Sequence, residues 1–365
     1  MAGAYVTVGL MESESAESTE SAESAGSTLD LSAVFRLAGI SEMGVLWQCI
    51  SAITRLEVPE RLADGGMNVA ELARAVGAVE QPLFRVLRFL AGHEIVAFKG
   101  GDVVLTKVGR LLVRDEPWSM WAVFAATGQQ DVAHVLPETL RTGRPAVEIV
   151  FGATLWEHLA TRPTAREAFD DLMHRQAHGL VSTCIPSLEW PAEGTVADIG
   201  GGRGILLAAA LNTAPGLRGI LVDRPEVFED AKEFLSQQQV MGRCELYPGD
   251  LFDPAPRADI YLLSFILHDW ADDNARRILH SIYRNAPRNA TLRIFERIVP
   301  DDDSAHVSKM FDMGMLLLGD GRERTLGELR DLLAECGWKI ESTIPAYADI
   351  SLIQAAHISG DGAGK

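Results

Sequence analysis

The feature that most constrains the fold is the segment 195-TVADIGGGRGILLAAAL-211. β-Branched and apolar residues lead into a cluster of glycines, and the glycines lead into an apolar segment of good helix formers. This order predicts a buried strand, a tight loop and a helix. Glycine loops at such a turn commonly bind a nucleotide, because the bare backbone lets the ligand approach closely.

Strand-like and helical segments alternate from this loop onwards. The pattern predicts an α/β domain with a mostly parallel, doubly wound sheet, whose ligands bind at the carboxyl ends of the strands. The expected strands are 195-TVADIG-200, 217-LRGILVD-223, 243-RCELYPGD-250, 258-ADIYLLSFI-266, 291-TLRIFERIV-299, 338-WKIESTI-344 and 350-ISLIQAAHI-358.

Four regions follow from composition and pattern. We expect a disordered acidic tail (1–28), a mostly helical domain (29–115), a helical linker that contributes to a substrate pocket (116–180) and the α/β domain (181–365). Asn68 is placed to cap a helix that stops at Gly77, and an apolar-faced helix follows. A hairpin around Gly100-Gly101 completes a winged-helix pattern.

Charge and cysteine content narrow the functional classes. The net charge of −18 argues against nucleic acids or anionic membranes as partners, so a winged-helix DNA-binding regulator is a distant alternative. The four cysteines lie far apart without metal-ligand spacing, which is typical of reduced thiols. No apolar run reaches about 18 residues, and no basic flank of a secretory signal is present. We therefore expect a cytoplasmic protein.

The loop 198-DIGGGRG-204 is neither a P-loop nor a dinucleotide-binding loop. No Gly-Lys-Ser/Thr follows it, and its glycines miss the dinucleotide spacing. Asp198, at the strand end, would repel a pyrophosphate and attract a cation. S-adenosylmethionine fits this requirement, because it carries an ammonium and a sulfonium and no phosphate.

Two further acids end neighbouring strands. Asp223 lies about 20 residues past the loop, the spacing at which an acid accepts hydrogen bonds from ribose hydroxyls. Asp250 is placed to accept from an adenine amino group, with Leu251 and Phe252 packing on the ring. One strand-end acid often only caps a helix, but three beside one glycine loop favour S-adenosylmethionine strongly.

These motifs resemble the S-adenosylmethionine-dependent O-methyltransferases of the plant caffeate and bacterial polyketide-tailoring type. The resemblance covers roughly residues 30–360, through 198-DIGGGRG-204, 223-DRPEV-227, 249-GDLF-252 and 267-LHDWADDNARRIL-279. It implies a Rossmann-like class I methyltransferase domain and an N-terminal winged-helix dimerisation domain. It also implies a homodimer that methylates a phenolic hydroxyl of a small aromatic or polyketide-type substrate, with S-adenosyl-L-homocysteine as the second product.

The resemblance also assigns residues. It implies His268 as general base, with Glu296 and Glu323 holding the imidazole; Glu323 is alternatively a partner of Arg322 or Arg324. Ser264 departs from the plant pattern, which often has lysine near the adenine. The implied cofactor-binding residues are Asp198, Gly200, Gly202, Asp223, Arg224, Asp250, Leu251, Phe252 and Ser264. The substrate-binding candidates are Met173, Asp269, Trp270, Phe311 and Met313, of which the two methionines are alternatively core. No metal is expected.

Physical chemistry supports the role of His268. A phenol with a pKa near 10 is almost wholly protonated at neutral pH, and a base with a pKa close to 7 removes its proton. His268 follows a buried strand at the binding edge of the sheet. Some bacterial relatives with this fold hydroxylate or guide a cyclisation instead, so a non-methylating enzyme that binds S-adenosylmethionine is the main alternative.

Overall fold

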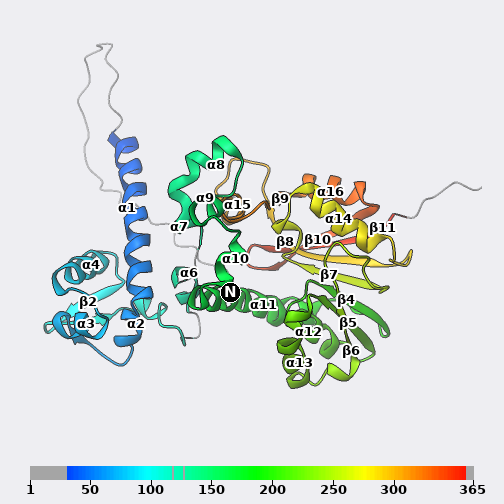
Figure 1. Cartoon of the computed structure of the whole chain (residues 1–365), viewed down its shortest axis with the longest axis horizontal. Coiled ribbons are helices and arrows are strands. Elements are labelled where there is room, and N and C mark those ends of the chain that lie inside the picture. Colours follow the sequence, from blue (N-terminus) through cyan, green and yellow to red (C-terminus); the bar gives the residue numbers. More distant parts are fainter. Residues whose placement is uncertain (1–30, 117–118, 126–127, 359–365) are drawn as a thin grey trace, which may run out of the picture. The chain divides into compact units, whose positions relative to one another are not determined.

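The computed structural model describes residues 31–116, 119–125 and 128–358. The chain divides into two compact units, Met1–Ala125 and Ala126–Lys365 (Figure 1). The predicted acidic tail lies outside the described residues. The finer predicted boundaries at residues 115 and 180 stay predictions.

The first unit contains the predicted helices and hairpin. The Asn68 side chain accepts a hydrogen bond from the Glu71 N–H at 2.9 Å, which confirms the predicted cap. Gly100 and Gly101 turn the hairpin with positive φ, and the strands form an antiparallel sheet of order β1-β3-β2. The elements are α1 (Leu31–Arg55), α2 (Val58–Arg61), β1 (Met67–Asn68), α3 (Val69–Ala75), α4 (Glu80–Gly92), β2 (Val96–Lys99), β3 (Asp102–Leu105), α5 (Lys107–Arg110) and α6 (Trp121–Ala125).

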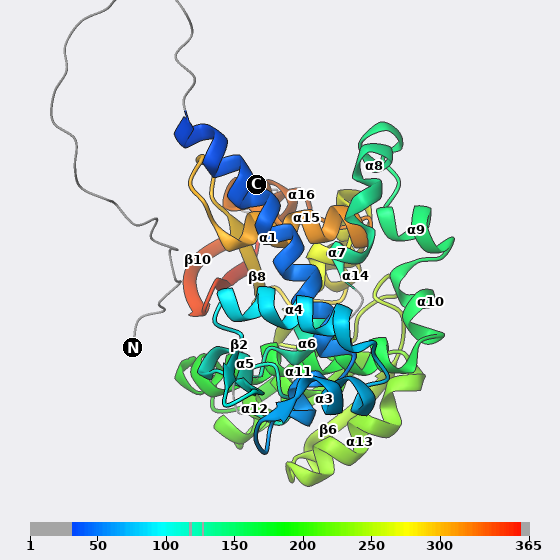
Figure 2. The same ribbon diagram turned by 90° about the vertical axis from the view of Figure 1, so that its left-hand side faces the viewer.

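Helix α1 buries only its C-terminal part in this unit. Ile50 and Ile53 join the core with Leu72, Leu87 and Leu90, whereas the first turns extend away from α3 and α4 (Figure 2). Among the residues that the structure describes, α1 is the helix that is long and apolar enough, by length and composition alone, to cross a membrane. Core helices of soluble proteins and signal sequences meet the same criterion.

The second unit is built on the predicted sheet. Its order is β10-β11-β8-β7-β4-β5-β6. Strands β4 to β8 pair in parallel, as predicted for a mostly parallel sheet, and β10 and β11 add antiparallel pairs at one end. The sequence did not reveal β9, whose two residues pair with β8. The strands are β4 (Gly194–Ile199), β5 (Leu217–Asp223), β6 (Cys244–Pro248), β7 (Ile260–Ser264), β8 (Thr291–Val299), β9 (Arg324–Thr325), β10 (Trp338–Tyr347) and β11 (Ile350–His357).

Helices cover both faces of this sheet (Figure 1). Successive residues of β4 point to opposite faces, so Val196 packs with α11 to α13 and Ala197 packs with α14 and α16. These helices are α11 (Pro163–Thr183), α12 (Ile205–Thr213), α13 (Phe228–Gln237), α14 (Asp272–Tyr283) and α16 (Leu326–Glu335), with the 3-10 turns η2 (Ile185–Ser187), η3 (Pro225–Val227) and η4 (Met241–Arg243) between elements.

A group of shorter helices packs on α15 (Val307–Leu318) in the same unit. Val132 and Ala146 contact Leu317, and Val147 belongs to a second apolar cluster against Leu318. The predicted helical region 116–180 thus consists mainly of helices where it is described. The group consists of α7 (Gln129–Val132), η1 (Ala133–Val135), α8 (Leu136–Thr142), α9 (Ala146–Phe151) and α10 (Leu155–Ala160).

Candidate active site

The glycine loop lies against the segment that follows β7. Gly200 has a φ of +67°, and a Cβ at this residue would lie 2.6 Å from the Ile266 side chain. Gly202 has a φ of +56° and open space where a Cβ would stand. A left-handed backbone and close contact both require glycine at position 200. The loop and the turn that carries His268 are therefore neighbours at the carboxyl edge of the sheet.

Asp198 is a buried carboxylate beside this loop. Its Oδ2 has no hydrogen-bond partner among the described residues, and a Cβ at Gly201 would lie 2.4 Å from it. Burial, together with the nearby charge of Asp223, raises the pKa of Asp198 to about 7. A cation placed at this oxygen would satisfy it, so the residues present fit the ammonium group of S-adenosylmethionine.

Asp223 and Asp250 stand at the ends of β5 and β6, where they were predicted. Asp223 accepts the Gly202 N–H at 2.8 Å and the Arg224 N–H at 2.7 Å, and thereby ties the glycine loop to β5. Asp250 accepts the Phe252 N–H at 3.1 Å and is exposed. Each carboxylate keeps lone pairs for a ligand.

The remaining predicted cofactor residues frame the same edge. Ser264 ends β7, and Leu251 and Phe252 pack partly buried against the core. The Phe252 ring meets Trp270 edge-on at 5.0 Å and carries the Arg277 guanidinium at 4.2 Å. Contacts with Trp270 and Arg277 therefore hold the Phe252 ring in place without a ligand.

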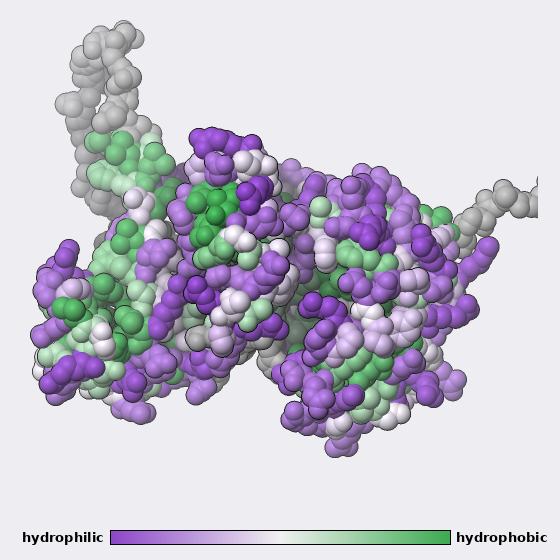
Figure 3. Space-filling view, viewed as in Figure 1, coloured by the Kyte–Doolittle hydropathy of each residue, from purple (hydrophilic) through white to green (hydrophobic). Residues whose placement is uncertain are grey.

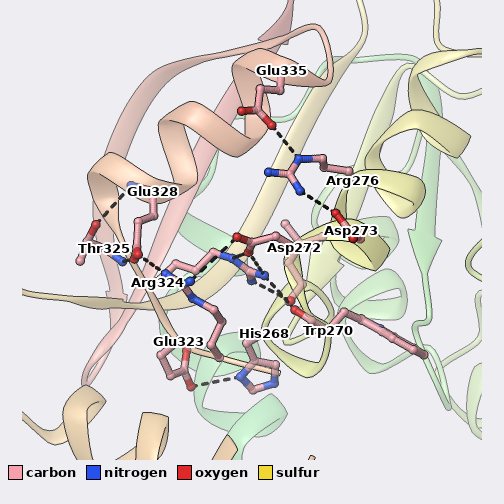
Figure 4. Close-up of polar contacts among 12 residues, drawn as sticks. His268, Trp270, Asp272, Asp273, Arg276, Glu323, Arg324, Thr325, Glu328 and Glu335 are labelled. Carbon is pink, nitrogen blue, oxygen red and sulfur yellow. Dashed lines mark hydrogen bonds and ion pairs between the residues drawn. The ribbon is translucent and has the colours of Figure 1, made fainter. Parts of the chain in front are cut away.

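His268 lies in the 3-10 turn η5 (Leu267–Asp269), directly after β7. Its Nδ1 lies 3.1 Å from Glu323 Oε1 (Figure 4). Glu296, on β8, accepts the N–H groups of Leu267 at 2.9 Å and His268 at 3.2 Å. The two acids therefore divide the work: Glu323 contacts the imidazole, whereas Glu296 holds its main chain.

The surroundings make His268 more basic than the sequence suggested. Burial lowers the pKa of His268, but the carboxylates of Glu296, Glu323 and Asp269 outweigh burial and raise it to about 9. Burial also raises the pKa of Glu296. The expectation of a base with a pKa close to 7 is therefore not met, because these surroundings favour the protonated imidazole.

Sequence reasoning missed the residues that fix the turn that carries His268. Arg324 is buried and donates to the carbonyl oxygens of Leu267 at 2.9 Å and Trp270 at 2.8 Å, and to Asp272 (Figure 4). Arg322 binds Glu328 and Arg324 binds Asp272. The alternative in which Glu323 pairs with Arg322 or Arg324 is therefore not the arrangement observed. The motif 321-GRERT-325 contains both arginines, but the sequence alone does not show which of them binds the turn.

Gly321 allows this turn to approach closely. The Arg322 N–H donates to the His268 carbonyl oxygen at 2.8 Å, and a Cβ at Gly321 would lie 2.0 Å from that oxygen. Asp312, on α15, accepts the Glu323 N–H at 2.9 Å. Helix α15 is thus tied to Glu323, the acid that contacts His268.

The predicted substrate residues divide into two groups. Asp269 Oδ1 lies 3.5 Å from His268 Nε2. The centre of the Phe311 ring lies 3.6 Å from the Arg297 guanidinium, which approaches Glu323. Trp270 directly follows the same turn, and its carbonyl oxygen accepts a hydrogen bond from Arg324. Met313 and Met173 are exposed, on α15 and α11, and their contact with substrate stays a prediction.

Ligand atoms of His268, Glu296 and Glu323 lie within 4.8 Å of one another, a spacing that also suits a metal ion. The hydrogen bond between His268 and Glu323 accounts for their closeness through a proton. The metal-free site therefore stays the prediction.

Comparison with known proteins gives the family. Residues 134–339 match the O-methyltransferase domain. The chain is 34% identical to the mitomycin biosynthesis 6-O-methyltransferase of Streptomyces lavendulae over 82% of this chain and 88% of that protein. It is 30% identical to aclacinomycin 10-hydroxylase of Streptomyces purpurascens, over 84% and 86%.

Solved structures agree with this match. The O-methyltransferase of neocarzinostatin biosynthesis, in complex with S-adenosylmethionine and 2-hydroxy-5-methyl naphthoic acid, aligns with a TM-score of 0.75. It is 30% identical, and the alignment covers 85% of this chain and 95% of that chain. The chain therefore belongs to the S-adenosylmethionine-dependent O-methyltransferase family.

Proposed function

We propose that the enzyme methylates a phenolic hydroxyl of a small aromatic natural product, with His268 as general base. The observation that carries the proposal is the buried pair of His268 Nδ1 and Glu323 Oε1, 3.1 Å apart, in a turn that adjoins the glycine loop. This pair leaves Nε2 to face the substrate. When His268 is neutral, Nε2 accepts the hydroxyl proton, and the negative charge of Glu323 stabilises the imidazolium that forms.

The side chains have distinct roles in this proposal. Glu323 orients the imidazole, and Glu296 and Arg324 hold the main chain of its turn. Asp269 Oδ1 lies 3.5 Å from Nε2, so a substrate hydroxyl would compete with this carboxylate for the nitrogen. A base with a raised pKa suits a phenol, because proton transfer is easiest between groups of similar pKa.

The cofactor residues act by binding and orientation. S-adenosylmethionine supplies the methyl group as an electrophilic sulfonium. Asp198 binds its ammonium, Asp223 accepts from its ribose, and Asp250 accepts from its adenine. The other proposed cofactor-binding residues line the same edge of the sheet: Gly200, Gly202, Arg224, Leu251, Phe252 and Ser264.

An aromatic substrate agrees with the relatives. One solved relative holds a naphthoic acid, and the predicted pocket residue Phe311 on α15 supplies an aromatic ring for a planar substrate. The test is incubation with the cofactor and a panel of hydroxynaphthoates, phenolic acids and anthracyclines, followed by mass spectrometry. An added methyl group on oxygen supports the proposal, and an added oxygen atom without methylation supports the hydroxylase alternative instead.

The hydroxylase alternative draws on the 30% identity to aclacinomycin 10-hydroxylase. The His268–Glu323 pair favours methylation, because a base for the substrate hydroxyl is what methylation requires. A DNA-binding function is opposed by the net charge of −18. Cytoplasmic location stays a prediction.

We propose further that the chain forms a homodimer through its N-terminal winged-helix domain, with residues 29–115 intertwined between chains. Figure 3 shows apolar residues along the outer turns of α1. Phe35, Leu37 and Ile40 are each more than 60% exposed. A helix face of this kind is stabilised by burial against a second copy.

A further inference from the structure

Arg297 is a buried cation that the preceding assignments do not use. It follows Glu296 on β8, and its side chain is 5% exposed. Its Nε donates to Asp349 Oδ2 at 2.5 Å, and its Nη1 lies 3.8 Å from Glu323 Oε1. That same oxygen meets His268 Nδ1 at 3.1 Å. One carboxylate oxygen therefore stands between two cationic groups.

Two aromatic rings keep the guanidinium in place. It lies 3.6 Å from the centre of the Phe311 ring and 5.0 Å from that of Phe265, which in turn lies 5.4 Å from the His268 ring. A cation held over ring faces in a buried site cannot move into solvent without losing these contacts. The position of Arg297 relative to Glu323 is thus defined by the protein.

We propose that Arg297 is a positioning residue that shares Glu323 with His268 and limits how strongly this carboxylate holds the imidazolium, with Asp349 as its anchor. The inference rests on the proposed role of His268. Arg297 lies closer to Asp349 than to Glu323. Asp349 therefore offsets part of the positive charge of Arg297 that acts on Glu323. Removing either partner shifts that balance in opposite directions.

The other charges around the base are fixed by contacts of their own. Asp269 belongs to the same turn, Glu296 binds main-chain N–H groups, and Asp312 binds the Glu323 N–H. The charged groups that face the base or Glu323 are Asp269 on η5, Asp272 on α14, Glu296 and Arg297 on β8, Asp312 on α15, Arg322 before β9 and Arg324 on β9. Arg297 is distinctive among the cations, because it approaches the oxygen that contacts the imidazole.

The test is the titration of His268 in the full-length enzyme labelled with ¹⁵N-histidine, with His268→Gln used to assign its signal. Arg297→Met removes the second cation from Glu323 and leaves its negative charge to His268 alone, so the pKa of His268 should rise by about one unit. Asp349→Asn removes the negative charge that offsets Arg297, so Arg297 acts more strongly on Glu323 and the pKa of His268 should fall. Arg297→Lys keeps the charge and should shift the pKa by less than half as much as Arg297→Met.

Arg293→Met is the matched control. Arg293 is a buried arginine on the same strand, but its guanidinium lies over Trp190 and donates to the Glu189 carbonyl oxygen. Its loss should leave the titration of His268 unchanged. An unshifted or lowered pKa in Arg297→Met would overturn the inference, as would a rise in Asp349→Asn.

Failure of this inference can be distinguished from failure of the proposed function. If His268→Gln retains full methyl transfer, the base assignment fails whatever the titrations show. If His268→Gln is impaired and the titration does not respond to Arg297→Met, only the role of Arg297 fails. The rise of the methylation rate with pH should shift in the same direction as the titration in each variant, which a purely structural role would not produce.

Discussion

Binding of S-adenosylmethionine should release a proton from Asp198. Without cofactor, the raised pKa of about 7 means that the carboxyl is half protonated at pH 7 and about nine-tenths protonated at pH 6. The cofactor ammonium favours the ionised form and lowers this pKa, so affinity should increase with pH. From the ionised fractions, the cofactor should bind about fivefold more weakly at pH 6 than at pH 7.

Isothermal titration calorimetry in buffers of different ionisation enthalpy measures both quantities. At pH 6, about 0.9 proton should be released per cofactor bound. Asp198→Asn should lose this release and flatten the affinity between pH 6 and pH 7, and should weaken binding at pH 7 by roughly 1.5–3 kcal/mol. The variant also corrects for titration of the ligand itself. Equal proton release by the wild type and Asp198→Asn would refute the reasoning.

Three further predictions address the loop, the turn and the assembly. Asp223→Ala should weaken cofactor binding by roughly 1.5–3 kcal/mol with the fold intact; unchanged affinity by calorimetry would refute the ribose assignment. Gly321→Ala places a methyl group 2.0 Å from the His268 carbonyl oxygen, so kcat should fall at least about tenfold with cofactor affinity preserved; an unchanged kcat would show that the turn accommodates it. Analytical ultracentrifugation should show a dimer at micromolar concentration that Phe35→Glu weakens, and a fully active monomeric wild type would contradict the proposed assembly.

Much of the fold follows from local patterns. The run of apolar residues in β5 and the cap at Asn68 are readable because their signals lie within a few residues. Strand-end acids such as Asp223 are equally visible, since parallel strands bring their carboxyl ends to one edge. The two-residue strand β9 gave no signal, because its pairing with β8 depends on residues far apart in the chain.

The electrostatics of the site could not be predicted in the same way. The raised pKa of His268 depends on the adjacent Asp269 and on two carboxylates, Glu296 and Glu323, that come from distant parts of the chain. Arg297 and Arg324 look alike in sequence, but one lies between Asp349 and Glu323 and the other binds the turn itself. Such roles depend on side-chain direction across long sequence separations, which no local pattern contains.

The measurement that tests the base assignment most directly is the His268→Gln defect across a series of phenols with pKa values from about 7 to 10. All rates are taken at pH 7.5, with saturation by cofactor confirmed for each protein. A weakly acidic phenol needs a base, so its methylation should fall about 10²–10⁴-fold. An acidic phenol is already ionised, and its defect should be much smaller. The wild-type rate should also rise with pH up to about 9, where His268 loses its proton. A defect of the same size for every phenol would contradict the assignment of His268 as the general base.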